Sequence, residues 1–107
     1  KKIAMRAGDT DRAKVVNPKK FSKLAKNISR NLKHVGNLDI DFLLLKNKEI
    51  VLDLNPRFGG GYPFTHEYGY NYIEKLFELL KNKNSKKFKK FTDKNIIFSK
   101  GITIHKH

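Results

Sequence analysis

The chain has 107 residues, enough for one small domain with a modest hydrophobic core. Its formal net charge of +14 comes mostly from Lys scattered among Asn and Ile, a pattern typical of a solvated surface and not of a nucleic-acid-binding stripe. The absence of cysteine excludes disulfides, thiolate metal sites and a cysteine nucleophile. No apolar run has the length of a membrane span and no signal-peptide pattern is present, so we predict a cytoplasmic protein without a membrane partner.

The first third of the chain predicts two strands and a helix. Strands are expected over residues 2–6 and 12–16, joined by a Gly-Asp-Thr-Asp turn. Asn17 then predicts a helix cap with Pro18 at the first helical position, where proline's missing N–H costs least. The helix is expected to stop at Gly36. Its apolar stripe, at helical spacing, consists of Phe21, Leu24, Ala25, Ile28, Leu32 and Val35.

The middle of the chain predicts a β-hairpin with acidic side chains on one face. If the turn is centred on Asn47, antiparallel pairing places Asp41 opposite Asp53 and Asp39 opposite Asn55. Alternation assigns the other face to the core. The hairpin covers residues 37–56; the expected core residues are Leu38, Ile40, Phe42, Leu44, Ile50, Leu52 and Leu54, whereas Leu43, Leu45 and Val51 share the acidic face.

The facing carboxylates indicate a cation site. Like charges directly across a ladder repel each other, and a hard cation is the simplest neutralising partner. Asp41, Asp53 and Asn55 supply the oxygen ligands that Mg²⁺ prefers, and Mg²⁺ needs few protein ligands when phosphate and water complete its octahedron. Arg57 would then hold phosphate. The alternative is that Asp39, Asp41 and Asp53 are solvated residues on the open face of a two-sided sheet.

The run LDLNPRFGGGYP resembles the C-terminal part of an ATP-grasp domain, the nucleotide-binding unit of carboxylate–amine ligases, biotin carboxylases and carbamoyl-phosphate synthase large chains. The family signature is an acidic residue in a hydrophobic strand, matched by Asp41, and then acid-x-Asn-x-Arg, matched from Asp53 to Arg57. The resemblance covers about residues 1–80, and PRFGGGYPFTHEYG and KIAMRAGDTDRA are most similar to the carbamoyl-phosphate synthase branch. It implies an α+β fold, an antiparallel sheet packed on two helices, as the C-terminal subdomain of an ATP-grasp fold.

The resemblance also implies roles for individual residues. Asp41, Asp53 and Asn55 would ligate the Mg²⁺ ions that bridge the ATP phosphates, with Mn²⁺ as a substitute. Arg57 would orient phosphate or an acyl-phosphate intermediate. Many family members have glutamate where this chain has Asp53, and the shorter side chain shifts the ligand oxygen by about one bond length.

Several further residues are candidates for ligand contacts. A triplet of glycines follows Arg57 and fits a backbone that passes close to phosphate or substrate, since no side chain intrudes. Arg6 is a further phosphate-binding candidate, and a surface salt bridge is its alternative role. His66 and Glu67 either contact an acceptor substrate or belong to a polar loop that enters a helix. The glycines are Gly59, Gly60 and Gly61.

The last third predicts a helix, a basic linker and a terminal hairpin. The helix is expected from about Asn71 to Asn82. Residues 81–94 are lysine-rich and predict a solvated linker, with a phosphate-tracking patch as the alternative. Residues 95–105 predict a hairpin turning at Ser99-Lys100, followed by an exposed tail with His105 and His107. The helix is expected to bury Tyr72, Ile73, Leu76, Phe77 and Leu80 and to expose Glu74, Lys75, Glu78 and Lys81.

These patterns predict that residues 1–107 are a partial ATP-grasp domain, in keeping with the Lys-Lys start. By resemblance, the complete enzyme uses ATP to phosphorylate a carboxylate, and an amine or other nucleophile then attacks the acyl phosphate. The rest of the enzyme would supply lysines, adenine contacts and a phosphate loop. The chain alone is therefore expected to bind magnesium–ATP weakly and to be inactive. The competing hypothesis is a non-catalytic basic module that binds nucleic acid or another acidic partner through residues 81–94.

Overall fold

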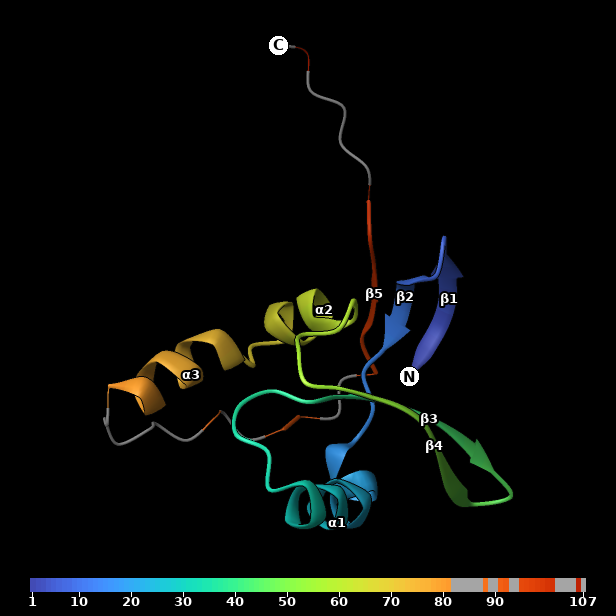
Figure 1. Ribbon diagram of the computed structural model, residues 1–107. Coiled ribbons are helices and arrows are strands. Elements are labelled where there is room, and N and C mark those ends of the chain that lie inside the picture. The colour runs from blue at the N-terminus through green and yellow to red at the C-terminus, as the bar shows by residue number, and fades with distance from the viewer. Residues whose placement is uncertain (82–87, 89–90, 93–94, 102–105, 107) are drawn as a thin grey trace.

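The computed structural model describes residues 1–81, 88, 91–92, 95–101 and 106, and its architecture is mixed α+β (Figure 1). The strands are antiparallel, as predicted, but they form two small sheets instead of one, with the orders β1-β2-β5 and β3-β4. In chain order the elements are β1 (Lys2–Arg6), β2 (Asp9–Lys14), the 3₁₀ helix η1 (Pro18–Phe21), α1 (Ser22–Leu32), β3 (Asp39–Leu45), β4 (Lys48–Asn55), α2 (Tyr62–Glu67), α3 (Tyr72–Leu80) and β5 (Ile97–Ser99).

Strands β1 and β2 form a tight hairpin. The turn residues Ala7 and Gly8 have φ of 47° and 81°, the left-handed conformation of a two-residue hairpin turn. The turn is therefore earlier and shorter than the sequence suggested. Strand β2 consequently begins at Asp9, which pairs with Arg6, and not at residue 12.

The third strand of this sheet comes from the end of the chain. Strand β5 lies antiparallel to β2, and Ser99 pairs with Arg12. The predicted hairpin turn at Ser99-Lys100 is therefore wrong, because Ser99 is part of a strand that pairs with β2. Residues 102–105 of that predicted hairpin, and His107, lie outside the described residues.

The helical segment after β2 begins where the sequence predicts. The Asn17 Oδ1 accepts a hydrogen bond of 3.0 Å from the Lys19 N–H, and Pro18 is the first helical residue. Only the first turn is a 3₁₀ helix; α1 then continues to Leu32 and ends at Lys33, whose φ is 49°. The predicted stop at Gly36 is thus too late, because a non-glycine residue already adopts the left-handed C-terminal conformation.

Helix α3 has nearly the predicted length but not the predicted orientation. Asn71 caps it, accepting a hydrogen bond of 3.1 Å from the Glu74 N–H. Phe77 is 58% exposed, whereas the ion-paired Lys75 and Glu78 side chains are each only 16% exposed. The Lys75 ammonium lies 5.3 Å from the centre of the Phe88 ring, which helps to explain why this polar side is covered. The short helix α2, Tyr62–Glu67, was not predicted as a separate element.

The apolar core of the described residues is small. Phe64 is their one buried hydrophobic residue, and its ring stacks on Phe98 with a centroid distance of 6.2 Å. The accessible surface is 9181 Å², against about 6,200 Å² expected for a compact protein of this mass. None of the helices in the described part of the chain has the length and apolar character needed to cross a bilayer.

The β3–β4 hairpin extends away from the helices (Figure 1). Its expected core face is only partly covered: Ile40 and Phe42 are half-buried, and the Phe42 ring lies 5.0 Å from the Phe21 ring, measured between ring centres. The residues of this face that belong to β4 are exposed. The hydrophobic hairpin residues that are more than a third exposed are Leu43, Leu44, Leu45, Ile50, Val51, Leu52 and Leu54.

Candidate functional site: paired carboxylates in an open cleft

The acidic end of the β3–β4 hairpin has the register that the sequence predicts. Asp41 pairs with Asp53, and Asp39 pairs with Asn55. Partners directly opposite each other in an antiparallel ladder project their side chains from the same face of the sheet. The carboxylates of Asp41 and Asp53 and the amide of Asn55 therefore belong to one face.

A β-bulge separates this acidic end from the hairpin tip. Asp41 pairs with Asp53 but Phe42 pairs with Val51, so Leu52 has no partner in β3. The extra residue shifts the tip by one position and places Ile50 opposite Leu43. The faces predicted for Ile50 and Val51 are therefore wrong: Ile50 lies on the carboxylate face and Val51 on the face of Phe42.

The paired carboxylates are held by donors from the protein. The Asp41 Oδ2 lies 2.6 Å from the Lys2 Nζ. The Asp53 Oδ1 accepts a hydrogen bond of 2.9 Å from the Leu54 N–H, and its Oδ2 accepts one of 2.6 Å from the Asn55 side-chain amide. These contacts offset part of the repulsion across the ladder and hold the Asp53 carboxylate in place.

Asp39 is a half-buried carboxyl group of this cluster. Burial raises its pKa, and the negative charges of Asp41 and Asp53 raise it further, while the positive charges of Lys2 and Arg57 oppose the rise.

The glycine loop passes directly over two carboxylates. A Cβ on Gly59 would overlap the Asp39 carboxylate, and a Cβ on Gly60 would overlap that of Asp9; nothing lies within 4 Å of a Cβ built on Gly61. Gly59 and Gly60 thus permit a close backbone approach, but to side chains of the protein; their predicted approach to phosphate or substrate stays a prediction. The nearby groups are carboxylates of the protein, and Asp9 has a lowered pKa because it accepts hydrogen bonds from the Lys100 ammonium and the Thr10 N–H.

Arg57 follows β4 and reaches the same region. Its backbone carbonyl accepts a hydrogen bond of 2.8 Å from the Asn37 side chain, which fixes the chain at this point. One guanidinium nitrogen donates to the Phe58 carbonyl at 3.1 Å. Arginine has five N–H donors, so the guanidinium N–H groups that do not contact Phe58 can donate hydrogen bonds to an anion.

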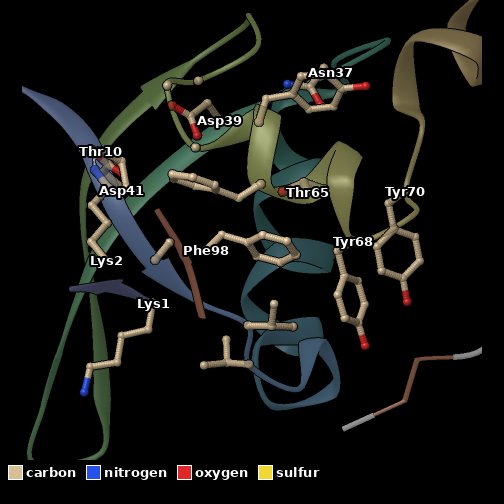
Figure 2. Close-up of a pocket in the computed structure, with 18 of the residues that line it drawn as sticks. Lys1, Lys2, Thr10, Asn37, Asp39, Asp41, Thr65, Tyr68, Tyr70 and Phe98 are labelled. Atoms are coloured by element: carbon tan, nitrogen blue, oxygen red, sulfur yellow. Dashed lines mark hydrogen bonds and ion pairs between the residues drawn. The ribbon is translucent and has the colours of Figure 1, made fainter. Parts of the chain in front are cut away.

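An open cleft of about 980 Å³ brings most of the predicted residues together. Figure 2 shows Asp39, Asp41 and Lys2 on one side of it and Tyr68 and Tyr70 on the other. The predicted residues that line it are Asp41, Asp53, Asn55, Arg57, Gly59, Gly60 and Gly61, and Asp39 lines it as well.

Other predicted residues lie elsewhere. Arg6 does not line the cleft and forms an ion pair with Asp11 at 3.2 Å, as its alternative role predicted. His66 and Glu67 are exposed residues of α2, and the His66 Nδ1 lies 3.3 Å from the Tyr62 hydroxyl oxygen. Neither lines the cleft.

Sequence reasoning missed Lys2, Asp9 and the tyrosines of the cleft. Asp9 belongs to a run that was assigned to a turn, and nothing local to Lys2 points to Asp41, its partner 39 positions later. The tyrosines alternate with other residues from the segment after α2 to the first residue of α3, and that spacing could have indicated a shared wall. They are Tyr68, Tyr70 and Tyr72.

The two phenylalanines of the basic segment pack against this tyrosine wall. Phe88 lies 5.2 Å from Tyr70 and 4.8 Å from Tyr72, and Phe91 lies 5.7 Å from Tyr68, measured between ring centres. Rings engaged in this way are less available for stacking on bases. Residues 82–87, 89–90 and 93–94 of the segment lie outside the described residues.

The described donor set is small, so a bound ion would have to bring ligands of its own. Within the described residues, no three His, Cys, Asp or Glu side chains converge closely enough to hold a metal. Asp41, Asp53 and Asn55 offer two carboxylates and one amide oxygen, so phosphate and water would have to complete the coordination of Mg²⁺. Comparison of the chain with protein-family models and with curated proteins found no significant match.

Proposed function

We propose that the chain is the metal- and phosphate-binding half of an ATP-dependent carboxylate–amine-type ligase of the ATP-grasp kind. The pairing of Asp41 with Asp53 across the β3–β4 ladder, beside Asn55, carries this proposal. The resemblance of the run from Asp53 to Arg57 to the family signature supports it, as does the presence of these residues in one cleft.

Each group would contribute by position and charge. Asp41, Asp53 and Asn55 would hold Mg²⁺, which supplies positive charge to the phosphoryl oxygens when bound. Arg57 would fix the direction of the phosphate through the N–H groups that it does not use on Phe58. Phosphoryl transfer depends mainly on positioning and electrostatics, so no nucleophilic side chain is required of this half.

The ligase would also need groups that this chain is not proposed to supply. The remainder of the enzyme would hold the adenine, the carboxylate substrate and the nucleophile that attacks the acyl phosphate. The isolated chain should therefore bind magnesium–ATP weakly and release no ADP.

Equilibrium binding of ATP to the 107-residue chain, with Mg²⁺ and with EDTA, tests the proposal. We expect weak binding that requires the divalent ion, because the phosphates would reach the carboxylates only through it. Binding that is equally strong in EDTA would contradict the proposal.

Titration with nucleic acids distinguishes the proposed function from the competing one, a basic binding module. Duplex DNA and single-stranded RNA are titrated at low and high salt, since binding through a lysine patch falls steeply with ionic strength. Sub-micromolar, salt-sensitive affinity for either polymer, without magnesium-dependent ATP binding, would favour the basic module.

A further inference from the structure

Lys2 connects the two sheets at the candidate site. It belongs to β1, yet its Nζ lies 2.6 Å from the Asp41 Oδ2 of β3, and it lines the same cleft (Figure 2). The ion pair thus joins a lysine of one sheet to a carboxylate of the other.

The position of this ammonium conflicts with a divalent ion bound at Asp41. Both cations need the same carboxylate, and two positive charges a few ångströms apart repel each other. Lys2 is 46% exposed at its side chain, and its four-carbon stem gives the ammonium several reachable positions. The ammonium can therefore leave Asp41 without any rearrangement of the β1 backbone.

We propose that Lys2 is a built-in counter-ion that neutralises Asp41 until a metal–nucleotide complex binds, and that it then moves to the phosphate oxygens. This inference rests on the proposed function. The incoming complex brings the divalent ion to Asp41 and oxygen anions into the cleft, so the lysine exchanges one anionic partner for another. Lys2 is then a phosphate-binding residue of the site.

The proposal predicts effects of opposite sign for two ligands. Without nucleotide, Lys2 competes with the metal, so Lys2→Met should bind Mn²⁺ about threefold more tightly or better. With ATP present, the same variant lacks a phosphate partner and should bind Mn²⁺–ATP about threefold more weakly or worse. A residue with a merely structural role would shift both affinities in one direction.

The two affinities can be measured by electron paramagnetic resonance of free Mn²⁺, with and without ATP. Lys20→Met, an exposed lysine of η1, controls for the lost positive charge. Lys2→Arg keeps the charge and should retain Mn²⁺–ATP binding near that of the wild type. Circular dichroism verifies that each variant is folded.

The proposal would be supported if Lys2→Met bound Mn²⁺ more tightly and Mn²⁺–ATP more weakly, and Lys20→Met showed neither change. Affinities of Lys2→Met that match those of Lys20→Met, or that fall together, would overturn it while leaving wild-type Mn²⁺–ATP binding intact. Failure of the wild type to bind Mn²⁺–ATP would instead overturn the proposed function, and the role of Lys2 with it.

Discussion

Asp53→Asn should lower magnesium-dependent ATP binding by about tenfold or more, because one of the two proposed anionic metal ligands is lost. The amide has the shape of the carboxylate. Asp53 is exposed, and its contacts are local, to the Leu54 N–H and the Asn55 amide. The fold should therefore survive, and calorimetric titration with ATP and Mg²⁺ would measure the loss.

Two control variants test whether the loss of binding depends on the carboxylate at position 53 and not on net charge. Asp53→Glu keeps the negative charge, so it should retain binding. Asp11→Asn removes one negative charge outside the cleft, where Asp11 pairs with Arg6, and should change binding little. Equal losses in Asp53→Asn and Asp11→Asn would show that only net charge matters.

Phe64→Ala should unfold the chain or nearly so. Phe64 is the buried hydrophobic residue of the described chain, and truncation of a buried Phe typically costs about 3–5 kcal/mol. A small domain has a total stability on the order of 5–15 kcal/mol, and this core has few other contributors. Urea unfolding followed by circular dichroism would measure the change.

The matched control is Leu80→Ala in α3. Leu80 is 79% exposed, so its truncation should change stability by less than about 0.5 kcal/mol. Similar losses in the two variants would show that the contact of Phe64 with Phe98 is not the centre of the core.

Some local signals in the sequence predicted the local structure, and others did not. The side chain of Asn17 caps a helical run as predicted, whereas the β1–β2 turn and the end of α1, which are equally local, were predicted too late. The β3–β4 turn was predicted to be centred on Asn47, but it consists of Lys46 and Asn47, both with positive φ. That turn pairs Leu45 with Lys48, and the bulge at Leu52 restores the predicted pairing of Asp41 with Asp53.

Features that depend on distant residues were not predictable in this way. The bulge at Leu52 adds one residue to a regular alternation, so Ile50 and Val51 exchange faces. The covered side of α3 is set in part by Phe88, which lies over Lys75 and beyond the end of the helix. Periodicity predicts which side of a helix is apolar, but it does not predict which residues cover that side.

The same distinction between nearby and distant residues applies to the candidate site. Its hairpin half could be predicted, because Asp41 and Asp53 share one ladder and Arg57 follows directly. The half contributed by β1 and β2 could not, because the ion pair of Lys2 with Asp41 joins two sheets. Arg6, one β1 residue chosen from sequence, lies outside the cleft.

Asp41 and Asp53 are proposed to share one divalent ion bound to nucleotide phosphate. Nuclear magnetic resonance of the side-chain carboxyl and amide groups, with Mn²⁺–ATP added below stoichiometry, can detect such a shared ion. We predict that the signals of Asp41, Asp53 and Asn55 broaden first and together, while that of Asp11 stays sharp. Broadening of Asp11 at the same Mn²⁺–ATP concentration, or of Asp41 without Asp53, would contradict a shared ion.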